Sequence, residues 1–396
     1  MNRLLFFVLV ILSLTTACRK PYIEAGTVLS DTVPWADSSN RHPKNAVYRA
    51  LLDKYKRLGF PGISLLINDR FGTWVGSAGY ADLKAKTPFG VSQVSKAASI
   101  TKLMLGTTVF KIIEDSVNTK LGYGFLDDPI SKWLPARVVD QLPNGRQITL
   151  GDCMKHETGL PDVIEEIPFY LAIVNEPVKA WKPEELLEFI NGKKALFRPR
   201  DSASYSNTNT ILVAMVVEAA TKQKHSSLMR KYVFAPLGMN QTFYQPHDPL
   251  PRTTAQGYYD LYNNGTLVNV GNITTGSGNG YGGLFSTVFD LWKFTDAMYL
   301  KKTVLTQKSL DKMNTWGQDD PPNRYGYGSM LKYIARGVDA GVGHSGRDFG
   351  HSGNLFYFPS RGVSHCFLLN YGTDGDSELR KVFRQFEQEL LDVTFQ

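Results

Sequence analysis

Strand-like segments lie at both ends of this 396-residue chain, and helical segments fill the part between them. Near the start, residues 63–67 and 73–78 are two strand-like segments joined by a turn, which is typical of a β-hairpin. The same signals return near the end, in residues 325–334, 340–343, 354–358 and 364–370. This order favours an α+β fold in which both chain ends build one antiparallel sheet flanked by helices.

The composition is that of a globular protein, with 42% hydrophobic and 20% charged residues. The folded body is predicted to be residues 44–396, and it begins with an amphipathic helix. Its α/β part comprises residues 44–117 and 290–396. An inserted, mostly helical subdomain comprises residues 118–289, where helical patterns alternate with loops rich in Pro, Gly and Asn. One such loop, residues 275–283, is either a turn that lines a cleft or a flexible link.

The N-terminus has the layout of a secretory signal. Residues 4–14 are apolar except for one serine, and this run is too short to span a bilayer as a mature helix. Small residues and then Cys18 follow, which resembles a bacterial lipoprotein cleavage site, although Thr15 stands where leucine is usual. We predict a signal peptide over residues 1–17, lipidation of Cys18 as the first mature residue, and a polar tether over residues 18–43. The protein is then exported and lipid-anchored to a bacterial membrane, facing the periplasm or on the cell surface.

Ser99 and Lys102 form a Ser-x-x-Lys motif at a point where a helix is expected to begin. A helix would place the lysine one turn above the serine, on the same face. In a dry pocket such a lysine can lose its charge and accept the hydroxyl proton, so that Ser99 becomes a nucleophile. The alternative is a helix-capping serine, which is what we predict for Ser309 in a second Ser-x-x-Lys, residues 309–312.

Two further motifs contain residue types that suit acyl transfer. A Tyr-x-Asn motif, at Tyr205 and Asn207, precedes a helical stretch. A His-x-Gly motif, at His344 and Gly346, falls between two predicted strands. Each motif has a second copy in the chain, at residues 262–264 and 351–353.

In their order along the chain, the three motifs resemble those of the β-lactamase-related serine hydrolases. This family includes penicillin-binding D,D-peptidases, class C β-lactamases, esterases and D-aminopeptidases. The resemblance covers residues 47–390 and extends to linking segments at residues 126–135, 148–161, 235–239 and 282–287. The family places its third motif fifteen residues before a proline, as His344 and Pro359 are spaced, which favours His344 over His351. The implied fold is the β-lactamase/transpeptidase-like α+β fold.

The resemblance implies a role for each motif residue. Ser99 attacks a carbonyl and forms an acyl-enzyme, while Lys102 and Tyr205 share the proton transfers. Asn207 offers its amide to the substrate, or else it is a loop or helix-capping asparagine. His344 joins the hydrogen-bond network of Tyr205, or else it is a structural strand histidine.

The strand that carries His344 is expected to bind substrate through Ser345, Gly346 and Arg347. The backbone N–H groups of Ser99 and Arg347 would hold the oxyanion. The Arg347 guanidinium either meets a substrate carboxylate or is solvated. His344 stands where class C β-lactamases have a lysine, which points towards the peptidase or esterase side of the family.

Other chemistries fit the sequence less well. The Gly-x-Ser-x-Gly elbow of α/β-hydrolases is incomplete at both candidate sites, and the histidines show no metal-ligand spacing. We predict no metal and no organic cofactor. The net charge is +7, but no dense Lys/Arg run accompanies it, so we predict no nucleic-acid partner. Cys153 and Cys366 either pair or remain buried thiols.

These observations predict an exported serine hydrolase that acts through an acyl-serine intermediate on D-amino-acid peptides, esters or β-lactams, with cell-wall peptides among the possible substrates. A D,D-carboxypeptidase or a D-stereospecific peptidase or esterase is favoured. The alternatives are a class C-like β-lactamase, a catalytically idle cell-surface binding protein on the same fold, and an α/β-hydrolase lipase.

Overall fold

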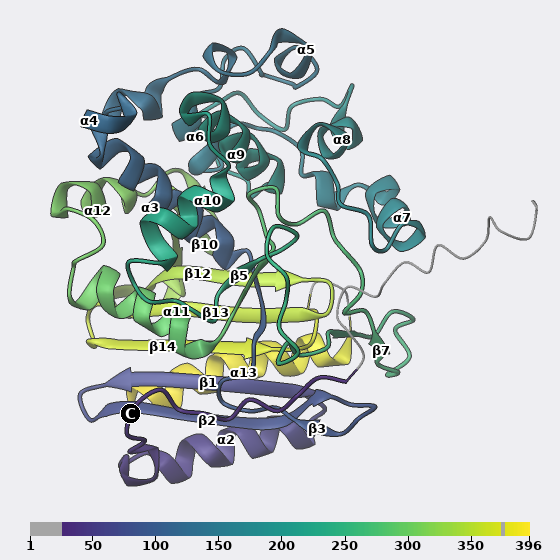
Figure 1. Cartoon of the computed structure of the whole chain (residues 1–396), viewed down its shortest axis with the longest axis vertical. Coiled ribbons are helices and arrows are strands. Elements are labelled where there is room, and N and C mark those ends of the chain that lie inside the picture. The colour runs from purple at the N-terminus through teal and green to yellow at the C-terminus, as the bar shows by residue number, and fades with distance from the viewer. Residues whose placement is uncertain (1–25, 374–376) are drawn as a thin grey trace, which may run out of the picture.

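A large antiparallel sheet with helices on both faces forms the body of the protein (Figure 1). The computed structural model describes residues 26–373 and 377–396, so the predicted signal peptide and Cys18 lie outside the described residues. Nine of the described strands form the sheet, in the order β3-β2-β1-β14-β13-β12-β11-β10-β9. Their bounds are Gly62–Asp69 (β1), Gly72–Asp82 (β2), Thr87–Pro88 (β3), Asp319–Asp320 (β9), Asn323–Tyr325 (β10), Met330–Lys332 (β11), Gly341–Asp348 (β12), His351–Phe358 (β13) and Val363–Leu369 (β14).

The sheet joins the two ends of the chain, as the sequence predicts. Strand β1 pairs with β14 in antiparallel register, with Ile63 opposite Leu369 and Asn68 opposite Ser364. Strand β2 continues the N-terminal hairpin on one side, and β13 continues the C-terminal strands on the other. The α+β architecture and the pairing of early with late strands are therefore confirmed.

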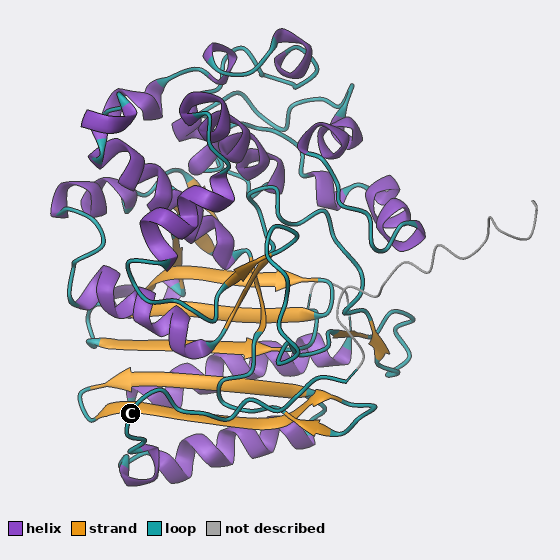
Figure 2. Cartoon of the chain, viewed as in Figure 1, coloured by secondary structure: helices purple, strands orange, loops and turns teal. Residues whose placement is uncertain are grey.

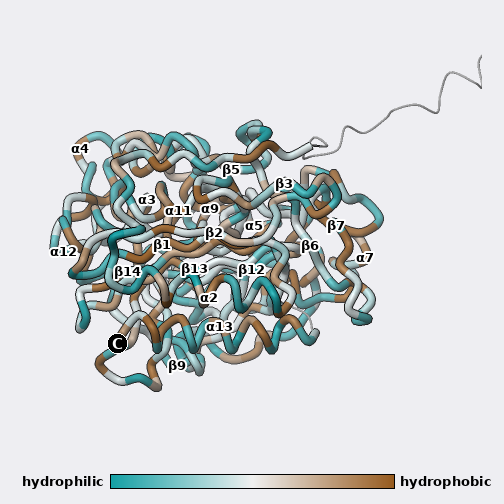
Figure 3. Tube along the Cα trace, turned by 90° about the horizontal axis from the view of Figure 1, so that it is seen from below, coloured by the Kyte–Doolittle hydropathy of each residue, from teal (hydrophilic) through white to brown (hydrophobic). Residues whose placement is uncertain are grey.

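Alternation along β1 divides the core between the two faces of the sheet. Ile63, Leu65 and Ile67 pack in one cluster with apolar residues of α2 and α13, whereas Leu66 packs in the cluster that contains α3 and α11. Seen from below in Figure 3, α2 and α13 run together across one face, and each alternates hydrophobic and hydrophilic residues as amphipathic helices do.

Helices gather at one end of the sheet, above β12 in the view of Figure 2. This region contains most of the predicted helical subdomain, and α3 runs into it from the sheet. The helices are Asn45–Arg57 (α2), Ile100–Glu114 (α3), Ser116–Thr119 (α4), Ala136–Val139 (α5), Leu150–Met154 (α6), Ile167–Asn175 (α7), Pro183–Leu187 (α8), Asn207–Thr221 (α9), His225–Met229 (α10), Val288–Thr295 (α11), Gln307–Met313 (α12) and Glu378–Phe395 (α13).

Two small sheets complete the described fold. One contains β4 (Ser95–Ala98), β8 (Leu284–Ser286) and β5 (Phe243–Tyr244), in the order β4-β8-β5. The other pairs β6 (Tyr258–Tyr259) with β7 (Val268–Asn269). Strand β4 matters most for the site, because it leads directly into α3.

The structure differs from the sequence predictions at α12 and in the segment before α2. Ser309 is not a helix cap: Thr306 caps α12 by accepting a hydrogen bond from the backbone N–H of Ser309, which lies buried inside the helix. The described part of the predicted tether, residues 26–43, lies against the body, where the ring of Trp35 packs edge-on against Phe289 at 4.8 Å. The cap of α12 is Thr306 because this residue directly precedes Gln307, the first residue of the helix.

Cys153 and Cys366 are both free and buried, which answers the question of their pairing. Burial raises the pKa of each thiol well above its ordinary value, because an apolar surrounding disfavours the thiolate. Across the described ranges, no helix combines the length and apolar character needed to cross a membrane.

Candidate active site

Ser99 sits at a strained turn between a strand and a helix. Ala98, the last residue of β4, has a φ of +49°, in the left-handed region that costs a non-glycine residue about 1–2 kcal/mol. Ser99 is then the N-cap of α3, but its side chain makes no capping hydrogen bond within the described structure. The hydroxyl is therefore not used for helix capping, and it lies at the positive end of a fifteen-residue helix.

Lys102 lies one turn into α3 and is almost completely buried. Its Nζ donates hydrogen bonds to Ser99 Oγ at 3.0 Å, to Asn207 Oδ1 at 2.7 Å and to the Tyr281 carbonyl at 2.7 Å. Burial lowers the pKa of Lys102 to about 7, although the negative charges of Asp162 and Asp348 act in the opposite direction. Near neutral pH, part of the population thus carries a neutral amine that can accept the Ser99 proton.

Asn207 connects Lys102 to a buried carboxylate. It is the first residue of α9, and its Nδ2 donates to Asp162 Oδ2 at 2.8 Å. Because a carboxylate only accepts hydrogen bonds, this contact turns the amide oxygen of Asn207 towards Lys102. Burial raises the pKa of Asp162 to about 6, and hydrogen bonds from Asn207 and Ile164 oppose that rise.

Tyr205 lies between several groups of the site. Lys102 Nζ is 4.9 Å from the centroid of its ring, and the His344 ring centroid is 6.2 Å away on another side. The ring also packs against His156 at 4.6 Å, whose Nδ1 accepts the backbone N–H of Ser206. The structure therefore brings Tyr205, Lys102 and His344 together, as the sequence predicts.

His344 is a neutral imidazole under ordinary conditions. Burial, together with the nearby Lys102 charge, lowers the pKa of His344 to about 3. Its Nδ1 lies 2.5 Å from the Ser345 carbonyl, which can only accept, so the Nδ1 tautomer carries the proton. His344 thus supplies hydrogen-bonding capacity and shape at this position rather than positive charge.

Strand β12 carries the third motif directly past the turn that holds Ser99. The strand runs through Asp348, so the motif lies within it and not between two strands. A Cβ on Gly346 would lie 2.0 Å from the carbonyl oxygen of Ala97 in β4, which explains why glycine is needed there. Because of this close approach, the next residue, Arg347, lines the same cavity as Ser99.

A buried network of charged side chains contacts β12 through Ser345. Lys332 in β11 donates to Ser345 Oγ at 3.1 Å and forms an ion pair with Glu387 of α13. Glu387 also accepts from Asn354 Nδ2 at 2.7 Å, and it lies 3.9 Å from the Arg347 guanidinium. Arg347 pairs only loosely with Glu387, and 37% of its side chain is exposed.

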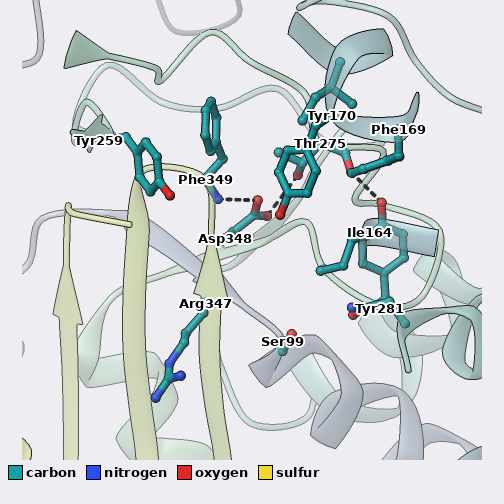
Figure 4. Close-up of a pocket in the computed structure, with 13 residues that line it drawn as sticks. Ser99, Ile164, Phe169, Tyr170, Tyr259, Thr275, Tyr281, Arg347, Asp348 and Phe349 are labelled. Carbon is teal, nitrogen blue, oxygen red and sulfur yellow. Dashed lines mark hydrogen bonds between the residues drawn. The ribbon is translucent and has the colours of Figure 1, made fainter. Parts of the chain in front are cut away.

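Two cavities meet at Ser99. One has a volume of about 230 Å³ and is walled largely by aromatic and aliphatic side chains (Figure 4). The other has a volume of about 510 Å³ and is lined mainly by polar and charged groups. The residues common to both cavities are Ser99, Ile164, Tyr170, Asn207 and Arg347. In Figure 4 the Arg347 side chain points away from the aromatic cluster.

The glycine-rich loop, residues 275–283, lines the apolar cavity, so the first of its two predicted alternatives holds. Gly280 has a φ of +96°, and a Cβ there would lie 2.4 Å from the Thr210 carbonyl. The loop holds the Tyr281 carbonyl against Lys102. The sequence motifs did not identify this carbonyl or Asp162. Asp162 does directly follow residues 148–161, one of the linking segments that resemble the family.

The second copies of the motifs lie elsewhere. Tyr262 is 69% exposed, so it does not have the partly buried position of Tyr205 among the site residues. His351 is buried in β13 and packs against Phe285 at 6.1 Å. The flanking sequence therefore selected the copies that the fold brings to Ser99.

The sequence profile of the beta-lactamase family matches residues 46–388. The chain belongs to the beta-lactamase family. Two curated relatives illustrate the membership. Penicillin-binding protein 4* of Bacillus subtilis (strain 168) is 24% identical over 323 residues, which cover 76% of this chain and 66% of the relative. The D-alanyl-D-alanine-carboxypeptidase/endopeptidase AmpH of Escherichia coli (strain K12) is 27% identical over 227 residues, which cover 57% of this chain and 54% of the relative.

Solved structures are similar over more of their length. A D-stereospecific amidohydrolase from Streptomyces sp. matches with a TM-score of 0.72 and 26% identity, covering 84% of this chain and 95% of that one. A D-amino acid amidase from Ochrobactrum anthropi SV3 matches with a TM-score of 0.71 and 26% identity, covering 83% and 91%. The chain spans less than two thirds of both curated relatives. The family membership supports the serine-hydrolase class that the motifs predict.

Proposed function

We propose that this protein is a serine hydrolase that forms an acyl-enzyme at Ser99 and cleaves amide, peptide or ester bonds of D-amino-acid substrates. The observation that carries the proposal is the buried Lys102 amine. It touches the Ser99 hydroxyl at 3.0 Å in surroundings that lower its pKa to about 7.

We assign a group to each step of the reaction. Lys102, with the neighbouring Tyr205, takes the Ser99 proton as Oγ attacks the carbonyl carbon. The tetrahedral oxyanion is held by the backbone N–H groups of Ser99 and Arg347, as the family resemblance implies. The same proton returns to the leaving nitrogen or oxygen when its bond to the carbonyl carbon breaks. Water then attacks the acyl-serine by the reverse sequence, releasing the acid and restoring Ser99.

Preference for D-configured substrates is inferred from the relatives. The names of the two structural relatives state D-stereospecific and D-amino-acid amide hydrolysis, and that of AmpH states D-alanyl-D-alanine carboxypeptidase activity. The apolar cavity beside Ser99, with Phe169, Tyr170 and Phe349 in its wall, favours a bulky side chain over alanine. A neutral His344 in place of lysine favours a peptidase or amidase over a class C-like β-lactamase.

Export and lipid anchoring are part of the proposal. They rest on the apolar run of residues 4–14 and on Cys18 after small residues. Labelling of cells with a lipid precursor, comparing the wild type with Cys18→Ser, tests the anchor. Label that stays on the Cys18→Ser variant contradicts it.

The decisive test is active-site labelling read by intact-mass and peptide-mapping spectrometry. A fluorophosphonate should add one adduct at Ser99, which disappears in Ser99→Ala. Ser309→Ala, in the second Ser-x-x-Lys motif, is the matched control and should label normally. Parallel incubation with a penicillin and with nitrocefin separates the family activities: rapid nitrocefin turnover would place the protein among the β-lactamases. Absence of any adduct would support the idle binding protein.

Substrate configuration is tested with matched pairs. The p-nitroanilides of D- and L-phenylalanine should differ in kcat/KM by at least about tenfold in favour of the D form. Equal rates for the two forms would contradict the proposed stereospecificity.

A further inference from the structure

Asp162 is a buried carboxylate with no cation of the described residues within 4 Å, and the positive charge that acts on it is that of Lys102, on the other side of Asn207. Three other buried carboxylates pair with a cation within 4 Å: Asp152 with Arg200, Asp290 with Lys293, and Glu387 with Lys332. Within the described residues, Asp162 forms no ion pair. It is only 9% exposed, and its carboxylate accepts hydrogen bonds from Asn207 Nδ2 at 2.8 Å and from the Ile164 N–H at 3.2 Å.

An unpaired buried charge is costly, so its position indicates what compensates it. Asp162 lines the polar cavity that contains Ser99. It is linked to the nucleophile through two hydrogen bonds, from Asn207 to Asp162 and from Lys102 to Asn207. When Lys102 is in its neutral, proton-accepting form, no nearby protein cation balances Asp162.

The arrangement of the two cavities assigns a place to each substituent of a substrate. Ser99 and Asn207 line both cavities, so a carbonyl at Ser99 leaves its α-carbon at their junction. A bulky side chain can occupy the apolar cavity, whose aromatic wall Figure 4 shows, and the other α-substituent then points to the polar cavity near Asn207 and Asp162. In an amino-acid derivative with a free amine, that substituent is an ammonium group.

We propose that Asp162 binds the free α-ammonium group of the substrate, so that the protein cleaves the bond that follows an unblocked amino-terminal D-residue. The inference rests on the proposed acyl-serine function and narrows its substrate class to D-amino-acid amides, esters and peptides with a free amino terminus. It separates an amidase or aminopeptidase from a carboxypeptidase, whose acyl donor is a peptide with a blocked α-nitrogen.

The test compares three p-nitroanilides at pH 7, where an α-ammonium group is largely charged. They are those of D-phenylalanine, N-acetyl-D-phenylalanine and 3-phenylpropanoic acid, which lacks the amine. The wild type should favour the free amine in kcat/KM. Asp162→Asn should reduce kcat/KM for the free amine by about 10- to 100-fold, chiefly through KM, because a charge-assisted hydrogen bond is lost. The two substrates without an ammonium group should change by less than about threefold. Glu166→Gln, which removes a nearby carboxylate that pairs with Lys193, should leave all three rates unchanged.

Three results would overturn the inference. Equal losses on all three substrates in Asp162→Asn would show that Asp162 only positions Asn207. A wild type that prefers the acetylated substrate would exclude an ammonium site while leaving the proposed hydrolase intact. Failure of the wild type to cleave any of the three, despite fluorophosphonate labelling at Ser99, would overturn both this inference and the proposed D-amino-acid specificity.

Discussion

Gly346→Ala should disable the site without touching a reacting group. The added Cβ would lie 2.0 Å from the Ala97 carbonyl oxygen, whereas real Cβ atoms keep at least 3.0 Å from such atoms. Strands β12 and β4 must therefore separate by about 1 Å, which is twice the tolerance of about 0.5 Å for a catalytic constellation. The movement draws the Arg347 N–H away from the proposed oxyanion position beside Ser99.

The expected loss follows from that displacement. A misplacement of about 1 Å costs about 10²-fold, and loss of one oxyanion donor costs about 10²–10³-fold, so kcat/KM should fall 10²–10³-fold. The assay is hydrolysis of an activated ester, with thermal unfolding recorded in parallel to establish that the variant folds. Gly124→Ala is the control, because a Cβ there meets no atom within 4 Å. A folded Gly346→Ala variant within fivefold of wild-type activity would refute the reasoning.

Three further predictions concern groups around the site. Because only a neutral Lys102 accepts a proton and burial lowers its pKa to about 7, kcat/KM for an uncharged ester should rise with pH up to about 7 and then level off; a flat profile from pH 5 to 9 would contradict this role. Glu387→Ala leaves Lys332 buried without its partner and should lower the free energy of unfolding in urea by about 3–5 kcal/mol, whereas Glu378→Ala, at an exposed ion pair, should change it by less than about 1 kcal/mol. Gly280→Ala forces a side chain into a left-handed position against a carbonyl of α9, and it should lower the rate of fluorophosphonate labelling; an unchanged rate would show that the loop does not hold the lysine.

The parts of the fold that the sequence predicted are those with strong periodic signals. The hairpin of β1 and β2, the amphipathic α2 and α13, and the pairing of early with late strands follow from apolar alternation and helical spacing. Strand β12 was predicted too short, because Gly, His and Ser after residue 343 carry little β-propensity. Their extended conformation comes from pairing with β13, because the register with β11 ends at Gly343.

For the site, the side chains of the three motifs could be predicted, but their supports could not. Motif spacing places Ser99 and Lys102 on the first turn of α3, and Asn207 opens α9, which packs against α3. The Tyr281 carbonyl is a backbone group, and any residue in that loop could have supplied it. Asp162 is one of many acidic residues in the sequence, and only the folded structure shows that it is buried against Asn207 and lines a cavity with Ser99.

The pairing of β1 with β14 has a consequence for how the protein is made. These central strands are separated by about three hundred residues of chain, so the middle of the sheet has a very high contact order. A ribosome must synthesise all the residues between them before β14 can pair with β1. The nascent chain therefore stays without its central sheet throughout synthesis, exposing the apolar strand β1, and we expect it to depend on holding chaperones until the last strands emerge.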